Sequence, residues 1–327
     1  MSLEKFGRLY GPKREGNIFT YAPIEKFEEL VLDDGIPLLP LKKLFHPRKF
    51  DMFRFDKEKF TPDYSTYEKR VILGAHPCEV HGILRLDEIF LAEPVDTYYA
   101  GLRNRSAIIG FSCIPDENSL CKSTGTDIVE EGFDLFFVNL DEFYLVWIGS
   151  SLGYDMVLQK EQFFDEKVTH DDILHYIDWR EKRDKLFKRS FNFNAMPDIM
   201  ELSYGSEIWD YFASKCLSCG QCSMVCPTCN CYNVVDHFDV TNEISGRRER
   251  SWDSCMFVDY SLVAGGHNFR GSRADRLKLW YTHKLKAFAH EYGKPGCVGC
   301  GRCVGTCPVD INVITVSEAL TSCEVKK

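Results

Sequence analysis

Two runs of cysteines in this chain share one spacing, and each run is followed by a proline. The first run is Cys216-x2-Cys219-x2-Cys222-x3-Cys226-Pro227, and the second is Cys297-x2-Cys300-x2-Cys303-x3-Cys307-Pro308. This spacing is typical of chains that bind cubane [4Fe–4S] clusters, because three closely spaced thiolates can surround one cluster from a single tight loop. Two complete sets of four cysteines favour iron–sulfur clusters over a zinc site or disulfides.

The fourth cysteine of each run follows three residues later, where it points away from the cluster that its own run surrounds. In two-cluster ferredoxins this cysteine ligates the other cluster. We therefore predict cluster 1 on Cys216, Cys219, Cys222 and Cys307, and cluster 2 on Cys297, Cys300, Cys303 and Cys226. Loop glycines would let backbone N–H groups approach the sulfurs; they are Gly220, Gly299 and Gly301. The pattern predicts two [4Fe–4S] clusters and electron transfer.

Three further cysteines, Cys78, Cys113 and Cys121, lie after or near the ends of two predicted parallel strands. Ligand sites in such sheets lie at the carboxyl ends of the strands, so these thiols could converge on a third metal site. Three thiolates do not complete the ligand set of a cubane, and Ser119 is our predicted fourth ligand, with His76 as the alternative. The competing interpretation is that all three cysteines are small buried core residues.

The remaining four cysteines are less informative. Cys229 and Cys231 follow the first run at once, and Cys255 lies further along the chain. These three could form another metal site or could pack against the first cluster. Cys323, near the end of the chain, has no predicted role.

Composition limits the class of protein. A length of 327 residues predicts two domains, and 44% hydrophobic with 13% aromatic residues is typical of a globular protein. The net charge of −9 disfavours nucleic acid as a partner. We find no signal-peptide pattern and no apolar stretch near the ~18 residues that a membrane span needs. We expect a cytoplasmic protein with no membrane span.

The first part of the chain alternates strand-like and helix-like patterns. Predicted strands are 71–74, 107–111, 135–138 and 144–148, and predicted helices begin near Ile24 and cover 79–91 and 171–188, the last with Thr169 as its N-cap. This pattern predicts an α/β domain over residues 1–195.

The rest of the chain reads as helical. Residues 206–214 and 274–292 have helical patterns, and Gly293 ends the second of them. We therefore expect an all-helical, ferredoxin-like dicluster domain over residues 196–327. The stretch 246–294 holds ten Lys or Arg against five Asp or Glu, which indicates either a docking face for an acidic partner or an ordinary solvated helix face. No nucleotide-binding motif and no catalytic residue stands out.

Several segments resemble one known family, which comprises the β subunit of archaeal cytosolic sulfhydrogenase and the iron–sulfur subunit of anaerobic sulfite reductase. The segments that carry the resemblance are 74–79 (GAHPCE), 112–117 (SCIPDE), 132–137 (GFDLFF), 248–255 (RERSWDSC), 262–270 (LVAGGHNFR) and 297–303 (CVGCGRC). The resemblance spans almost the whole chain. One departure is that members of the family often carry Cys-x-Cys where this chain has Ser119-Leu120-Cys121.

The resemblance implies an iron–sulfur subunit of a cytosolic hetero-oligomer. Its partners would be a flavin subunit that handles NAD(P)H and a catalytic subunit, which is a nickel–iron pair in the hydrogenases and a sirohaem subunit in the sulfite reductases. We expect an electron-transfer subunit of a hydrogenase with no active site of its own. The alternatives are the iron–sulfur subunit of a sulfite reductase and an enzyme with its own flavin site in the α/β domain.

Overall fold

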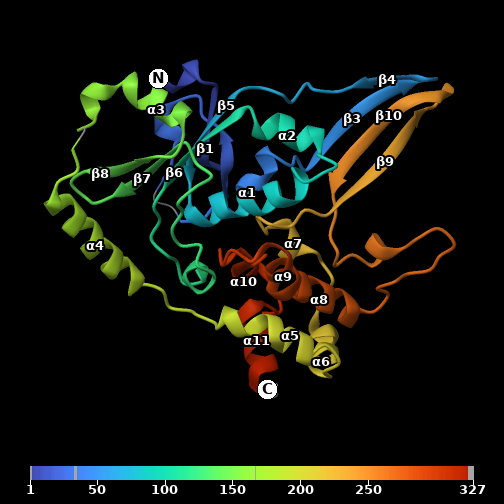
Figure 1. Ribbon diagram of the computed structural model, residues 1–327. Coiled ribbons are helices and arrows are strands. Elements are labelled where there is room, and N and C mark those ends of the chain that lie inside the picture. Colours follow the sequence, from blue (N-terminus) through green and yellow to red (C-terminus); the bar gives the residue numbers. More distant parts are fainter. Residues whose placement is uncertain (1, 33–34, 166, 323–327) are drawn as a thin grey trace.

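The larger of two sheets, sheet A, organises the first half of the chain in the computed structural model, which describes residues 2–32, 35–165 and 167–322 (Figure 1). Its strand order is β2 (Ile18–Pro23), β1 (Arg8–Glu15), β5 (Arg70–Ala75), β6 (Ser106–Phe111), β7 (Leu135–Asn139) and β8 (Tyr144–Ile148). Strands β1, β5, β6 and β7 are parallel, and β2 and β8 are antiparallel edges. The predicted α/β arrangement and the parallel pairing of β5 with β6 are confirmed.

Helices cover both faces of sheet A, because β5 and β6 are apolar on both sides. Ile72 and Ile108 pack under α1 (Pro77–Phe90) and α2 (Thr97–Arg103), whereas Val71 and Ile109 face the core shared with α3 (Ser151–Leu158). Continuous apolar strands are typical of sheets buried on both faces.

The second sheet, sheet B, corrects the all-helical prediction for the C-terminal half. Its antiparallel order is β4 (Lys59–Pro62), β3 (Lys49–Asp56), β10 (Asn242–Trp252) and β9 (Tyr232–Asp239). The hairpin between the cysteine runs therefore pairs with a strand from the N-terminal half of the chain. Every residue of β9 is exposed, so this strand lacks the apolar alternation that indicates a half-buried strand in a sequence.

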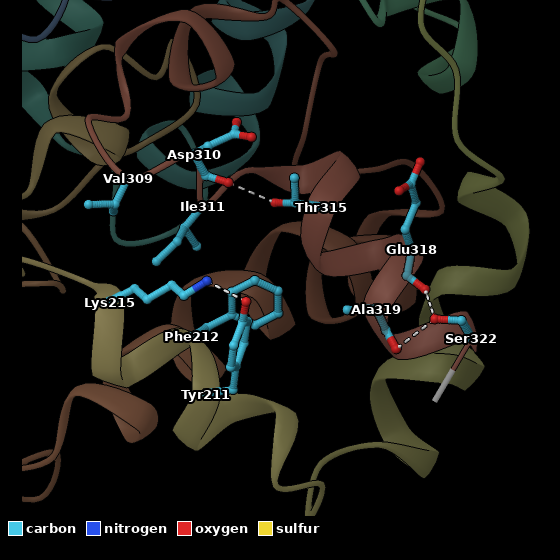
Figure 2. A pocket seen from close by; sticks show the side chains of 10 residues that line it. All are labelled: Tyr211, Phe212, Lys215, Val309, Asp310, Ile311, Thr315, Glu318, Ala319 and Ser322. Atoms are coloured by element: carbon cyan, nitrogen blue, oxygen red, sulfur yellow. Dashed lines mark hydrogen bonds between the residues drawn. The ribbon is translucent and has the colours of Figure 1, made fainter. Parts of the chain in front are cut away.

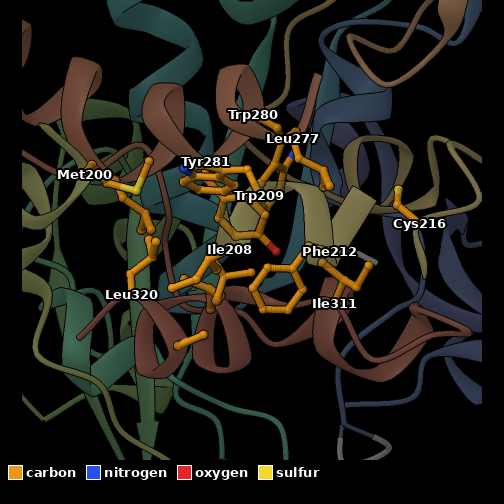
Figure 3. Close-up of a cluster of buried hydrophobic side chains, with 14 of the residues drawn as sticks. Met200, Ile208, Trp209, Phe212, Cys216, Leu277, Trp280, Tyr281, Ile311 and Leu320 are labelled. Atoms are coloured by element: carbon orange, nitrogen blue, oxygen red, sulfur yellow. The ribbon is translucent and has the colours of Figure 1, made fainter. Parts of the chain in front are cut away.

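A helical core surrounds the cysteine runs. Its helices are α5 (Met196–Leu202), α6 (Ile208–Lys215), α7 (Gln221–Met224), α8 (Arg273–Thr282), α9 (Phe288–Tyr292), α10 (Arg302–Thr306) and α11 (Val313–Ser322). A π-helical turn, η8 (His283–Ala287), joins α8 to α9, and Gly293 caps the helix in the left-handed conformation, as predicted. Figure 3 shows Trp209 and Tyr281 packed in this core beside Phe212.

Two other helix predictions have different outcomes. Thr169 and Asp172 form the predicted capping box of α4 (His170–Asp184). The predicted helix from Ile24 is wrong, because the chain there follows β1: the Ile24 N–H donates to the Leu9 carbonyl and the Val31 N–H to the Pro12 carbonyl, both at 2.9 Å.

Short 3-10 helices are η1 (Ser2–Lys5), η2 (Phe27–Glu29), η3 (Leu41–Leu44), η4 (Cys121–Thr124), η5 (Glu161–Phe163), η6 (Phe193–Ala195) and η7 (Val258–Ser261). No helix in the described part of the chain is long and apolar enough to cross a membrane.

A buried ion pair joins the start of α1 to the second cysteine run. Glu79 is fully buried and contacts Arg302, which lies between Cys300 and Cys303. Glu79 also accepts a 2.8 Å hydrogen bond from the Leu41 N–H, and Arg302 Nε donates to the Pro37 carbonyl at 2.8 Å. Both charges therefore have hydrogen-bond partners in addition to each other.

Removal of one partner should destabilise the protein strongly. We expect Glu79→Ala to lower the free energy of unfolding by about 3–5 kcal/mol, because it leaves the Arg302 charge buried without a partner. The control is Arg248→Ala, which breaks an ion pair to Asp236 whose side chains are 42% and 32% exposed and should cost below about 1 kcal/mol. Chemical denaturation followed by circular dichroism measures both, and equal losses would contradict this assignment.

Candidate metal centre

The first cysteine run lines a cavity together with one cysteine of the second run. Cys216 caps the end of α6, Cys222 lies on α7, and Cys307 caps α10 from the other run. The thiols that line the cavity are those of Cys216, Cys219, Cys222 and Cys307. Apolar side chains of Met256, Leu277, Trp280, Tyr281 and Ile311 form much of the remaining wall.

A second cavity has the complementary set of cysteines. Its thiols are those of Cys226, Cys297, Cys300 and Cys303. Trp280 on α8 lines both cavities, so its side chain lies between the two sites. The structure thus brings the eight cysteines together in the two groups that the spacing predicts.

The two runs fold alike around their first cysteines. The Ser218 N–H donates to Cys216 Sγ and the Gly299 N–H to Cys297 Sγ, each at 3.4 Å. Ser218 and Gly299 occupy equivalent positions and both have left-handed backbones, with φ of 51° and 58°. The Ile311 N–H donates to Cys307 Sγ at 3.3 Å. These donors favour thiolates, which are the form of cysteine that binds iron.

Burial makes these thiols depend on a bound cation. It raises the pKa of Cys222 to about 12 and that of Cys297 also to about 12, with neighbouring thiolates adding to the rise. Such groups are neutral at pH 7 unless a metal supplies positive charge. Two enclosed sets of four cysteines with backbone N–H donors fit [4Fe–4S] clusters, in which each iron takes one cysteine ligand.

The N-terminal cysteines lie beside the second cavity. Cys78 and Cys121 pack with Val298 and Cys300 in one buried cluster, and Cys113 is close enough to Cys121 to raise the pKa of its thiol. The backbones meet closely here: the Leu120 N–H donates to the Gly299 carbonyl at 2.7 Å, and a Cβ on Gly299 would lie 2.5 Å from the Cys121 nitrogen. Only glycine fits this position.

The two predicted candidates for a fourth ligand differ in their bonding. Ser119 is buried, but its hydroxyl donates to Asp116 Oδ1 at 2.7 Å and accepts from the Asp116 N–H at 3.0 Å. His76 is also buried, and its Nδ1 has no hydrogen-bond partner among the described residues. Burial and the charge of Arg302 lower the pKa of His76 to about 4, so its ring is neutral at pH 7 and able to bind a metal.

The other cysteines form two pairs. Cys229 lies against Cys226, and Cys231 lies against Cys255 at the base of the β9–β10 hairpin. Cys323 lies outside the described residues. Among the residues that the structure describes, no three His, Cys, Asp or Glu side chains are placed to hold a single metal ion.

The ten basic residues of stretch 246–294 do not share one face. Arg250, Arg276 and Lys284 are buried. Others pair with carboxylates: Arg247 with Asp51, Arg248 with Asp236, Lys286 with Glu201 and Lys294 with Glu131. The burial of these three side chains was not predictable from the sequence, because the charge of a residue carries no information on its burial.

A further pocket lies between α6 and α11 (Figure 2). Val309 and Ile311 line both this pocket and the first cavity. Figure 2 shows Lys215 reaching Tyr211, while Glu318 lies on the α11 side. No cysteine is among the described residues that line the pocket, and it adds no metal ligand to the centre.

Cys231 should be unusually reactive. A hydrogen bond from the Cys255 thiol, helped by the Tyr260 hydroxyl, lowers the pKa of Cys231 to about 6. Its alkylation by iodoacetamide should therefore rise with pH to half-maximum near pH 6 and be flat above pH 7, as followed by peptide mass spectrometry of the cluster-loaded protein. Cys255→Ala should slow the reaction at pH 6.5 roughly tenfold or more, because less thiolate is present. The control is the unfolded chain, in which the wild type and Cys255→Ala should react alike. A half-maximum near pH ~8.5 in the native protein, which is the value of a free thiol, contradicts the assignment.

Comparisons with known proteins agree with this geometry. Residues 215–311 match the family model of the 4Fe-4S dicluster domain. The chain is 40% identical over 314 residues to the sulfhydrogenase 2 subunit beta of Pyrococcus furiosus, a match that covers 96% of this chain and 92% of that protein. No solved structure matches the chain. The chain therefore belongs to the family of sulfhydrogenase β subunits, and it is an iron–sulfur electron-transfer protein with a 4Fe-4S dicluster domain.

Proposed function

We propose that this protein is the electron-transfer subunit of a cytoplasmic hydrogenase complex and that it holds two cross-ligated [4Fe–4S] clusters. Cluster 1 is bound by Cys216, Cys219, Cys222 and Cys307, and cluster 2 by Cys297, Cys300, Cys303 and Cys226. The observation that carries the proposal is that each cavity combines three cysteines of one run with the fourth cysteine of the other. When bound, such clusters supply one-electron transfer.

The two sites differ in their access to partners. Cys219 is exposed, so cluster 1 has an edge at the surface. The second cavity is covered by segment 118–121 of the α/β part and is next to Cys78 and Cys121. One site therefore faces the solvent, and the other faces the N-terminal half.

The N-terminal cysteines are the basis for a third iron–sulfur cluster in this proposal. Cys78, Cys113 and Cys121 would be three of its ligands, as the sequence predicts. Because the Ser119 hydroxyl is bonded to Asp116 and the Nδ1 atom of His76 has no partner among the described residues, His76 is the proposed fourth ligand.

A protruding segment beside cluster 1 is the proposed docking surface. Segment 257–271 extends away from the helical core in Figure 1, and Phe257 lies over Gly220 of the first run. Its exposed apolar side chains include Val258, Leu262, Val263 and Phe269. Arg270 and Arg273 follow them, so the surface suits an acidic partner with apolar contacts. The partners in this proposal are a flavin subunit that handles NAD(P)H and a hydrogenase-type catalytic pair.

The first test is cluster content. The purified chain should contain about eight iron atoms and about eight acid-labile sulfides in its two ferredoxin-type sites, before any third site is counted. Cys226→Ala should remove the cluster of the second run, although Cys226 belongs to the first, and Cys219→Ala should remove only the cluster of the first run. Iron analysis and electron paramagnetic resonance (EPR) measure this; zinc in place of iron, or loss of the first-run cluster in Cys226→Ala, contradicts the proposal.

The second test is turnover by the isolated protein. It should accept electrons from dithionite but show no hydrogen, sulfite or NAD(P)H turnover until its partner subunits are added. Addition of partners should restore activity with a rate of association that falls as salt rises, because Arg270 and Arg273 attract an acidic surface. NAD(P)H oxidation by the isolated protein, at a rate comparable with the complex, would show that it is an enzyme in its own right.

A further inference from the structure

Two buried lysines lie next to the second cavity, and neither has a carboxylate partner among the described residues. Lys284 and Lys42 are each 2% exposed. A buried ammonium group without a counter-charge costs several kcal/mol, so such groups are paired in stable proteins. The anionic groups that act most strongly on both lysines are cysteine thiolates.

Lys284 reaches a predicted cluster ligand through one side chain. It lines the second cavity, and its Nζ donates to Thr228 Oγ1 at 2.5 Å. Thr228 Oγ1 lies 3.2 Å from Cys226 Sγ and donates to the Gly296 carbonyl at 2.6 Å. Burial alone would lower the pKa of Lys284, but the thiolates of Cys226, Cys229 and Cys297 raise it above its usual value. The Lys284 ammonium group thus lies one hydroxyl away from a cysteine of the second cavity.

Lys42 approaches the same loop from η3. Its Nζ donates to the carbonyls of Cys229 at 2.9 Å and Ser223 at 3.2 Å, and it lies 4.2 Å from the centre of the Trp252 ring. The carbonyls and the ring stabilise the charge but do not neutralise it. Arg302 also lies near this cavity, but Glu79 already balances its charge.

The first cavity has no such cation on its described wall. No lysine or arginine is among the described residues that line it. Arg276 donates a 3.2 Å hydrogen bond to the Ser218 hydroxyl of the first run, and it donates others to the carbonyls of Arg270 and Gly271. The two sites therefore have the same four-cysteine chemistry in different electrostatic surroundings.

We propose that Lys284, supported by Lys42, is the buried counter-charge of cluster 2 and raises its reduction potential above that of cluster 1. A reduced cluster carries one more negative charge, so a fixed cation nearby stabilises the reduced form. An electron shared between the two sites therefore rests on cluster 2, beside the N-terminal cysteines. This inference rests on the proposed function, because it needs both clusters to be present.

The test is an EPR-monitored redox titration of the cluster-loaded chain. Lys284→Met should lower the equilibrium constant for electron transfer from cluster 1 to cluster 2 at least tenfold. This corresponds to a fall of about 59 mV in the reduction potential of cluster 2, a one-electron couple, while the potential of cluster 1 should stay unchanged. Lys284→Arg should keep the wild-type potential, because it keeps the charge. Cys219→Ser, which alters only a ligand of cluster 1, assigns the two signals.

Lys286→Met is the matched control. Lys286 lies on the same π-helical turn, but it is half-buried and pairs with Glu201, so its removal should change neither potential. Unchanged potentials in Lys284→Met, or equal shifts in both clusters, would overturn the inference. If Lys284→Met does not assemble cluster 2, the same redox titration is carried out on Lys42→Met. An unchanged potential of cluster 2 in that variant overturns the inference. Absence of two clusters from the wild-type chain would instead refute the proposed function.

Discussion

The contact between the second cysteine run and the segments that follow the central strands β5 and β6 of sheet A is the constraint on which the rest of the structure depends. It has two parts: the buried Glu79–Arg302 ion pair, and the backbone contact of Leu120 with Gly299. Glu79 lies in the first turn of α1, directly after β5, so the ion pair ties the cysteine run to the most buried strands of the sheet. A residue larger than glycine at position 299 would push segment 118–121 away and open the second cavity.

Charge balance around the buried sulfur atoms explains why hydrogen-bond donors and buried cations lie beside them. Thiols in an apolar core stay protonated unless cations lie nearby, and the structure supplies backbone N–H donors at both sites. At the second site it also places Lys284 and Lys42 close to Cys226. The buried lysines are costly without an anionic centre and the anionic centre is costly without cations, so each accounts for the other.

Sheet B makes the two halves of the chain depend on each other. Strand β10 pairs with β3 along its length, and Arg250 on β10 forms a buried ion pair with Asp96 and lies 3.7 Å from the centre of the Tyr232 ring. The proposed division into residues 1–195 and 196–327 is therefore crossed by a sheet. The β9–β10 hairpin between the cysteine runs joins the helical core to the α/β part. Helix α8 follows the hairpin and places Trp280 between the two cavities.

The sequence by itself determined the chemistry, because ligand spacing is local. Three cysteines within seven residues must share one loop, so each run predicts one site, and the structure places the fourth cysteine of each run in the cavity of the other run. The buried strands β5 and β6 were also predictable, since a short, continuous apolar run such as Val71–Leu73 is typical of a strand that is buried on both faces. Tertiary structure decided what depends on distant contacts. The hairpin β9–β10 has an exposed outer strand and is held by pairing with β3, and the segment after Ile24 follows β1 instead of forming a helix. It also decided which charges are buried: Lys284 and Lys286 are two residues apart and alike in sequence, yet only the fold turns Lys284 toward the sulfurs of the second cavity.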